Sequence, residues 1–567
     1  MQALIRKAGH VLDDPVLRRW LVRRAVGLEK SRPAFIVGQP PYLGSTISDG
    51  EIPRSILGDF PAGEFATPDE PVRIELPGQT VELAPENPSA LFDQPYDDLE
   101  TLLAAHRFSW LPVARPSVDT DWVAALWRTW VDRFASEMSG WPWHAYTAAE
   151  RAINIIDFSR RFGWPGDPSD TATLLAHHAD IIRRNLEYFG DDYTSNHLSN
   201  NGRGLLRIGS ALGMMGCADT GAQIMVAEAG RIFGRSGVLR EGSTHYHLLV
   251  TRNYIDAWLD ARAADLEHTG MLHDIAERAF AVIPQLHLPG GLPLIGDISP
   301  DVPPAHLAAL TGGGDSNSWP SNLPEDRQRD VRDLIAASAV VSPDKLADDG
   351  WHRFGGHQWQ ALAFVSPDGW PPMPGHGHHD LGSFELHDGE RPIIVDPGRG
   401  SYSDTDYAGA QLHNYLTIDG AGPTSVNRPY YSNEYRGLVS GVAPSMSRTP
   451  TGGTLTNAGF SRLRGVGTAL REWRFLEDRL EILDRVEGQG THRIRRQFHT
   501  TAASRQDSRG ATLEFDGAGY NLFSDCRPTV IETDSFTSYG CARPGYQITF
   551  DQKVSLPFES KTIIVRL

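Results

Sequence analysis

The feature that most constrains the fold of this sequence is a single change of hydrophobic periodicity near residue 340. Before this position apolar residues recur at helical spacing: within 121–137, Val123, Leu126, Trp127 and Trp130 fall on one face. After it, apolar and polar residues alternate over short stretches bounded by Asp-Gly turns. A run of helices followed by a run of strands predicts two different architectures in series.

The predicted elements divide the chain into three parts. We expect helices over 121–137, 148–162, 172–189, 205–215, 222–233, 247–265 and 271–283. Their short links contain Gly or Pro and favour antiparallel helix pairs, arranged as a bundle or as a toroid. We expect strands over 359–365, 383–386, 392–395, 415–418, 481–486, 511–515 and 561–565. The predicted parts are an N-terminal helix with a wrapping segment (1–90), a helical domain (91–340) and a β domain (341–567).

The composition narrows the classes of function. The 567 residues carry 53 Lys and Arg against 71 Asp and Glu, a formal net charge of −18. Because a phosphate backbone is neutralised by a basic surface, this balance argues against a nucleic-acid binder. It is compatible with an acidic polymer held in a locally basic cleft. The sequence has no run of about 18 apolar residues, so it predicts no membrane span, and it leaves the oligomeric state open.

The first 30 residues are basic and amphipathic. Leu17, Trp20, Leu21 and Leu28 fall on one face of a predicted helix, which either packs on the main domain or binds a membrane surface or partner helix. The segment lacks the continuous apolar stretch of a secretory signal, so we expect a cytoplasmic protein. A chain trimmed of its leader would instead be periplasmic or secreted. Three cysteines are too few for a disulfide scaffold.

Histidines are concentrated in the segment 375–380, Gly-His-Gly-His-His-Asp. In an extended backbone the imidazoles of His376 and His378 project to the same side, because side chains alternate with a period of two. Asp396 and His413 follow further along the chain. Two histidines and a carboxylate suit a divalent metal, most readily zinc. The pattern alone leaves open two other interpretations, hydrogen-bonded structural histidines and a purely catalytic pair.

Two polar clusters stand at predicted helix starts. Asn196 and His197 lie in Ser-Asn-His-Leu-Ser-Asn-Asn (195–201), which is also a good N-cap sequence. Tyr246 lies between two histidines in Glu-Gly-Ser-Thr-His-Tyr-His, a segment that begins at Glu241. The plainer interpretation of this second cluster is a polar cap with the tyrosine packed at the domain edge.

A third stretch combines aromatic rings with a cation. Trp143 and Tyr146 lie in Trp-Pro-Trp-His-Ala-Tyr, and Arg151 follows them. Aromatic faces and an arginine fork suit sugar rings and carboxylates. They suit a corner between packed helices equally well. Arg203 and Arg252 are further candidates for cations in a cleft, with helix packing as the plainer role.

Together these stretches resemble the heparinase II/III-like polysaccharide lyases. The resemblance runs from about residue 102 to 420 and keeps the motifs in order. Its specific part is Gly-His-Gly-His-His-Asp-Leu-Gly-Ser-Phe-Glu-Leu, followed by Ile-Ile-Val-Asp-Pro-Gly and His-Asn. It implies an incomplete (α/α) helical toroid followed by an antiparallel β-sandwich. It also implies cleavage of a uronic-acid-containing polysaccharide by β-elimination, with the polymer unidentified.

The resemblance also implies roles for individual residues. Asn196 matches the family residue that contacts the substrate carboxylate, and His197 matches its active-site neighbour. Tyr246 and His376 match the catalytic pair: either Tyr246 is both base and acid, or His376 is the base and Tyr246 the acid. The implied ligands of a structural metal are His378, Asp396 and His413. As candidate substrate contacts we add Trp143, Tyr146, Arg151 and Glu241.

The sequence departs from the family pattern at a few positions. It also leaves two other functions open. His379 stands where the family usually has Ala, and Arg203 and Arg207 replace a blander stretch, which could alter the substrate. One alternative is a non-catalytic glycan-binding or assembly protein of bacterial polysaccharide production. The other is a zinc-dependent glycan hydrolase, in which the metal activates water.

Overall fold

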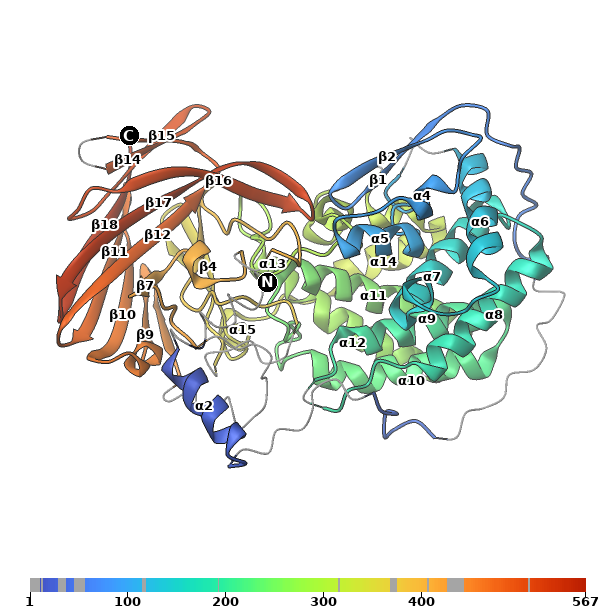
Figure 1. Cartoon of the computed structure of the whole chain (residues 1–567), viewed down its shortest axis with the longest axis horizontal. Coiled ribbons are helices and arrows are strands. Elements are labelled where there is room, and N and C mark those ends of the chain that lie inside the picture. Colours follow the sequence, from blue (N-terminus) through green and yellow to red (C-terminus); the bar gives the residue numbers. More distant parts are fainter. Residues whose placement is uncertain are drawn as a thin grey trace.

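The chain folds into a helical region followed by an antiparallel β region (Figure 1). The computed structural model describes residues 11, 14–28, 37–44, 57–114, 119–191, 193–314, 317–367, 375–404, 407–425, 443–507 and 510–567. Its helices after the N-terminal segment are α4 (Ala90–Asp93), α5 (Leu99–Arg107), α6 (Thr120–Phe134), α7 (Ala145–Phe162), α8 (Pro168–Arg184), α9 (Asn196–Leu212), α10 (Met215–Ile232), α11 (Thr244–Ala263), α12 (Thr269–Phe280), α13 (Ile283–Leu286), α14 (Glu325–Ala337) and α15 (Pro343–Ala347). All seven predicted helices are present.

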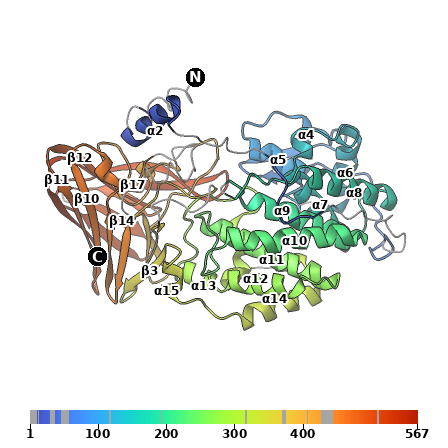
Figure 2. The same ribbon diagram turned by 90° about the horizontal axis from the view of Figure 1, so that it is seen from below.

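The helices form a two-layered, incomplete toroid (Figure 2). Helices α7, α9 and α11 are buried on nearly every face, because they pack on one another and on α8, α10 and α12. The closest approach is between α9 and α10. A Cβ on Gly209 would lie 2.3 Å from the backbone nitrogen of Ala218, so only glycine allows this packing.

The β region is a sandwich built from three antiparallel sheets. The largest has the order β13-β14-β15-β18-β11-β10-β9-β8, and two four-stranded sheets have the orders β16-β17-β12-β7 and β3-β4-β5-β6. The strands are β3 (Trp351–Gly356), β4 (Trp359–Phe364), β5 (Phe384–Asp388), β6 (Arg391–Ile394), β7 (Leu416–Ile418), β8 (Ser445–Thr449), β9 (Gly452–Asn457), β10 (Val466–Phe475), β11 (Arg479–Gly488), β12 (Thr491–Thr500), β13 (Ala503–Gln506), β14 (Gly510–Phe515), β15 (Ala518–Phe523), β16 (Thr529–Ser538), β17 (Cys541–Ser555) and β18 (Phe558–Arg566). One apolar cluster spans the three sheets.

The N-terminal segment is only partly described. Helix α2 (Pro15–Ala25) buries Leu17 and Trp20, and an ion pair of 3.6 Å joins Asp14 at its start to Arg462 of the β region. The prediction that Leu28 shares the apolar face is wrong, because Leu28 lies beyond the helix end and is 66% exposed. Strands β1 (Val72–Leu76) and β2 (Gln79–Leu83) form a hairpin in the expected wrapping segment. Residues 1–10, 12–13, 29–36 and 45–56 of that segment lie outside the described residues.

The sandwich is fixed to the end of the toroid at which its inner helices begin. The amide of Asp297 donates to the carbonyl of His376 over 2.8 Å, and the amide of Leu294 donates to Glu385 over 3.0 Å. On the other side, the hydroxyl of Tyr539 donates over 3.1 Å to Asp98, the N-cap of α5. No helix among the described residues is both long and apolar enough to cross a membrane.

Buried neutral histidines make the fold sensitive to acid. His247 accepts a hydrogen bond from the amide of Leu239 (3.2 Å) and donates one to the carbonyl of Ala279 (3.1 Å), so its bonds fix a neutral ring. Burial lowers the pKa of His247 to about 4. The unfolded chain, with an ordinary histidine pKa of about 6.5, therefore binds a proton that the folded chain does not bind.

We expect the stability of the protein to fall as the pH drops from 6.5 towards 4. His247 alone removes about 2 kcal/mol at pH 5, because its folded-state pKa lies below its unfolded value. The His247→Asn variant should take up about one proton fewer on unfolding at pH 5, measured from the slope of unfolding free energy against pH. The exposed His273→Asn variant on α12 is the control and should keep the wild-type slope. An unchanged slope in His247→Asn would contradict this assignment.

Candidate functional site

Tyr246 and His376 meet where the two regions join. Ser243 caps α11 by accepting a hydrogen bond from the amide of Tyr246, which places the phenol in the first turn of the helix. The ring of His376, from the segment before β5, stacks on the phenol with centroids 3.5 Å apart and planes 7° apart. Tyr246 is 5% exposed and the side chain of His376 is 13% exposed. The structure thus brings together a tyrosine and a histidine that the sequence places on different domains.

Asp297 organises the residues around this pair. One carboxylate oxygen lies 3.1 Å from Nδ1 of His376, and the other lies 2.8 Å from Nε2 of His378 and accepts from Arg399 over 2.9 Å. Burial alone would raise the pKa of Asp297, but the hydrogen bonds from the two histidines and the Arg399 charge hold it far below its usual range. Asp297 is therefore a carboxylate, and Nδ1 of His376 carries the proton that it donates. The Nε2 atom of His376 is left to act as a base.

Tyr402 completes the environment of the phenol. The hydroxyl of Tyr246 bonds to the hydroxyl of Tyr402, which donates to the carbonyl of Ile298 over 3.4 Å. Burial, followed by the charge of Asp301, raises the pKa of Tyr246 well above its usual value, and burial does the same for Tyr402. Tyr246 is therefore protonated at neutral pH and available as a proton donor.

Asn196 is held in place by a buried carboxylate. Its side-chain amide and its backbone amide each donate over 2.7 Å to Glu241, whose side chain is fully buried. Oε2 of Glu241 also lies 3.6 Å from Nε2 of His376. A carboxamide has two N–H donors, and Glu241 accepts one of them. The other can donate to a ligand, so Glu241 orients Asn196 and the structure gives no sign of a direct substrate contact by Glu241.

Tyr146 and His197 lie together beside Asn196. Their ring centroids are 4.6 Å apart, and the hydroxyl of Tyr146 donates to Asp301 over 2.6 Å. Arg107 donates to the other oxygen of Asp301 over 2.9 Å. Nδ1 of His197 lies 2.8 Å from Glu187. Burial would lower the pKa of His197, but the charge of Glu187 raises it. The 40% exposed side chain of His197 therefore presents a ring edge to solvent beside Asn196.

Trp143 and Arg151 lie inside the helical region, and the prediction that they contact substrate needs correction. The Arg151 guanidinium lies 3.8 Å from the ring centroid of Trp130 and donates to His178 (2.9 Å) and to the carbonyl of Pro142 (2.7 Å). Trp143 donates to the carbonyl of Phe134 over 2.7 Å and is 4% exposed. Their partners are interior ones, although Nη2 of Arg151 has none among the described residues, so the two side chains form the corner between packed helices that was the alternative.

His378, Asp396 and His413 form a buried trio. One potential ligand atom from each lies within 4.8 Å of the others. Nδ1 of His413 lies 2.8 Å from Asp396. Nδ1 of His378 and Nε2 of His413 are buried without a hydrogen-bond partner. Unpaired buried imidazole nitrogens are expected where a metal is bound, so this donor set fits a divalent cation such as zinc. No described feature identifies the metal.

The sequence analysis missed Asp297, Arg399 and Tyr402. Asp297 follows Gly296, where a Cβ would lie 2.4 Å from the carbonyl oxygen of Gly242, and the φ of Gly296 is +81°. A Gly-Asp pair after Leu-Pro-Leu-Ile was therefore a weak signal for a tight approach to α11. Arg399 and Tyr402 directly follow the Asp396 motif, and a search of its flanks could have found them.

Comparisons with known proteins agree with this layout. Residues 341–561 match the family described as "Heparinase II/III-like, C-terminal". A crystal structure of heparinase III superposes with a TM-score of 0.60 at 16% identity, covering 84% of this chain and 79% of the other. A heparinase III gene product gives 0.54 at 15% identity, covering 84% and 80%. A mutant heparan sulfate lyase HepC from Pedobacter heparinus gives 0.52 at 16% identity, covering 84% and 78%. No curated protein matches the sequence.

Proposed function

We propose, from the premise that residues 341–561 match the heparinase II/III-like C-terminal family, that the chain is a polysaccharide lyase acting on a uronic-acid-containing polymer by β-elimination. The observation that carries the proposal is the stacking of Tyr246 on His376, with centroids 3.5 Å apart, beside an oriented Asn196. This arrangement places a proton donor, a base and a carboxylate-binding amide in one site.

The first task of such a site is to make the C5 proton of the uronate acidic. Removing that proton develops a second negative charge beside the carboxylate. A neutral donor aimed at the carboxylate stabilises the enolate-like transition state more than the ground state. The free N–H of Asn196 supplies such a donor, and His197 adds a partly exposed ring beside it. Because Glu241 fixes Asn196 in advance, little reorganisation accompanies the reaction.

The second task is to move two protons. Asp297 accepts from Nδ1 of His376, so Nε2 is the free basic nitrogen and takes the C5 proton. Tyr246, whose pKa is raised by burial, donates its proton to the departing C4 oxygen. Tyr402 can then donate a proton to Tyr246 through the hydrogen bond between their two hydroxyls. Of the two acid–base assignments that the sequence leaves open, these contacts favour His376 as base and Tyr246 as acid.

The test of the proposed function is the appearance of an unsaturated uronate. Purified protein is incubated with heparan sulfate, heparin, chondroitin sulfate, hyaluronan and alginate, and the ultraviolet absorbance of the new double bond is followed. Heparan sulfate comes first, because similar structures are named as heparinases and a heparan sulfate lyase. We expect product from at least one polymer. Hydrolysis products without the double bond would favour the hydrolase alternative and contradict elimination.

We also propose that the buried trio holds one structural zinc ion. His378 and His413 would bind through imidazole nitrogens and Asp396 through its carboxylate, and the bound ion would clamp the segment that carries His376. All three residues are buried, with His378 4% and Asp396 5% exposed, which supports a role in shape over water activation.

Removing a ligand should therefore lower metal content and thermal stability together. We expect His413→Ala to lose zinc, measured by elemental analysis, and to lower the Tm by several degrees. The control is His273→Ala, from the exposed group of His273, Asp274 and Glu277 on α12. It should keep both the zinc content and the Tm. Wild-type protein without stoichiometric zinc, after purification free of chelators in zinc-supplemented medium, would overturn this proposal.

A further inference from the structure

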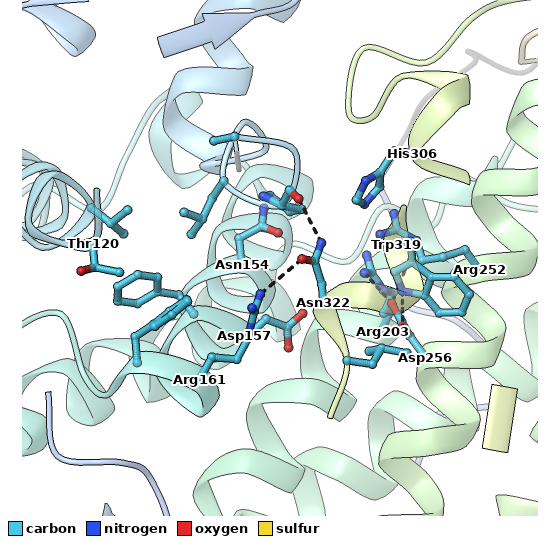
Figure 3. Close-up of a pocket in the computed structure, with 17 residues that line it drawn as sticks. Thr120, Asn154, Asp157, Arg161, Arg203, Arg252, Asp256, His306, Trp319 and Asn322 are labelled. Atoms are coloured by element: carbon cyan, nitrogen blue, oxygen red, sulfur yellow. Dashed lines mark hydrogen bonds and ion pairs between the residues drawn. The ribbon is translucent and has the colours of Figure 1, made fainter. Parts of the chain in front are cut away.

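A pocket is lined by residues of the helical region (Figure 3), and neither Tyr246 nor His376 is among them. Its polar lining includes Asn154 on α7, Arg203 on α9, and Arg252 and Asp256 on α11. Arg252 follows Tyr246 by six residues, which is about 9 Å along the helix. The pocket shares no lining residue with the cluster around His376. A ligand bound in it would therefore contact other residues than those assigned to the proposed lyase activity.

Arg252 is a cation of this pocket whose guanidinium has no hydrogen-bonded acceptor among the described residues. It is 6% exposed, and its nearest carboxylate, on Asp256, is 4.0 Å away. That carboxylate is already occupied, since it accepts from Arg203 over 3.1 Å and from the indole of Trp319 over 3.2 Å. Within the described part of the chain the Arg252 guanidinium makes no hydrogen bond, and its Nε is fully buried. A buried cation without an acceptor is strongly unfavourable, so this position is suited to an anionic ligand.

His306, on the 3-10 helix Pro304–Thr311, supplies a second unpartnered atom. Its Nδ1 lies 3.1 Å from the carbonyl of Asn317, and a carbonyl can only accept, so Nδ1 carries the proton. Its Nε2 is buried without a partner. Burial and the charge of Arg252 lower the pKa of His306 to about 4. The ring is therefore neutral, and Nε2 is an acceptor that requires an O–H or N–H donor.

The remaining lining combines apolar side chains with the polar residues Thr120, Asp157, Arg161 and Asn322. Figure 3 places Arg252, His306 and Trp319 together on one side of the pocket, and Phe158 and Leu323 are among the apolar residues that line it. The cavity volume of about 90 Å³ corresponds to roughly six water molecules. A ligand for this space is small and carries an acceptor for Arg252, a donor for His306 and a short hydrocarbon part.

We propose that this pocket binds a small hydroxy-carboxylate, with its carboxylate on the guanidinium of Arg252 and its hydroxyl donating to Nε2 of His306. The charge-assisted bond to a buried arginine provides most of the affinity. The hydroxyl provides the preference over a plain carboxylic acid. Asp157 and Asp256 are held by other arginines, so they leave Arg252 free to accept the ligand.

Isothermal titration calorimetry with sodium lactate tests the proposal on the full-length protein. We expect saturable binding of lactate, about fivefold weaker binding of propionate, which lacks the hydroxyl, and at least tenfold weaker binding of uncharged methyl lactate. Arg252→Gln should weaken lactate binding at least tenfold, and Arg252→Lys should restore part of it. His306→Phe should bind lactate and propionate equally. Arg262→Gln, from the exposed end of the same helix, is the control and should bind as the wild type does.

Three results would overturn the proposal. The first is the absence of saturable lactate binding to folded wild-type protein, and the second is equal affinity for lactate and methyl lactate. Both measurements use the wild-type protein, so they test the proposal even where a variant fails to fold. Circular dichroism of each variant establishes its fold before titration. Sulfate binding as tight as that of lactate would also contradict it, because sulfate offers no donor to His306.

Discussion

Replacing Tyr246 with Phe is expected to lower kcat/KM for the uronate polymer by a factor of about 10² to 10⁴. The substitution removes only the hydroxyl that protonates the departing oxygen, and the stacking of the ring on His376 is retained. The polymer should still bind, so KM should change much less than kcat. Initial rates of unsaturated product across a range of polymer concentrations give both constants.

A matched control is available on the same helix. Tyr254 is also a buried tyrosine of α11, and its hydroxyl donates to the carbonyl of Met225 over 2.8 Å, far from the stacked pair. Tyr254→Phe should lower stability by about 1 kcal/mol and leave kcat within a factor of two or so. A Tyr246→Phe enzyme with wild-type kcat would refute the assignment of Tyr246 as the acid.

Asp297→Ala is expected to destabilise the protein by about 3–5 kcal/mol, because it leaves a buried arginine without its carboxylate. Asp297 is 4% exposed and holds His376, His378 and Arg399 together at the junction of the two regions. Unfolding in urea, followed by tryptophan fluorescence, measures the loss. Activity should fall as well, since His376 loses the partner that fixes its proton on Nδ1.

The comparison variant for this prediction is Asp330→Ala. Asp330 also pairs with an arginine, Arg262, at 2.7 Å, but the arginine is 54% exposed. An exposed ion pair contributes about 1 kcal/mol or less. Equal destabilisation by the two substitutions would show that Asp297 contributes no more to stability than an exposed carboxylate does.

The change from helical to alternating periodicity was sufficient to predict a helical region followed by a β region, whereas the toroid and the sandwich were implied by the resemblance. The last helix of the first region ends at Ala347 and the first strand of the sandwich begins at Trp351, close to the predicted change. Helix starts were predicted less well: α9 begins at Asn196 and not at 205. Most polar residues of 196–203 are buried and bond to other segments, as Asn196 does to Glu241 and Asn201 to Glu187. Such buried polar side chains interrupt the apolar repeat on which the prediction relied.

Only those residues of the candidate site that belong to a sequence motif could be predicted. The resemblance pointed to Tyr246, His376 and the trio, and the structure places all of them at or beside the junction of the two regions. Asp297 had no motif, because its role depends on three partners that are distant in sequence. Arg151 was misjudged for the opposite reason. Aromatic rings beside an arginine look the same in a sequence whether they face a sugar or a helix core.

The orientation of the inner helices has an electrostatic consequence. Helices α5, α7, α9 and α11 begin at Leu99, Ala145, Asn196 and Thr244, and the first turns of α7, α9 and α11 carry residues of the candidate site. Each helix start carries about half a positive elementary charge from its aligned peptide dipoles. These partial charges converge on one mouth of the ring. In a chain with a net charge of −18, these partial charges make this end of the ring more favourable for an anion than the net charge alone suggests.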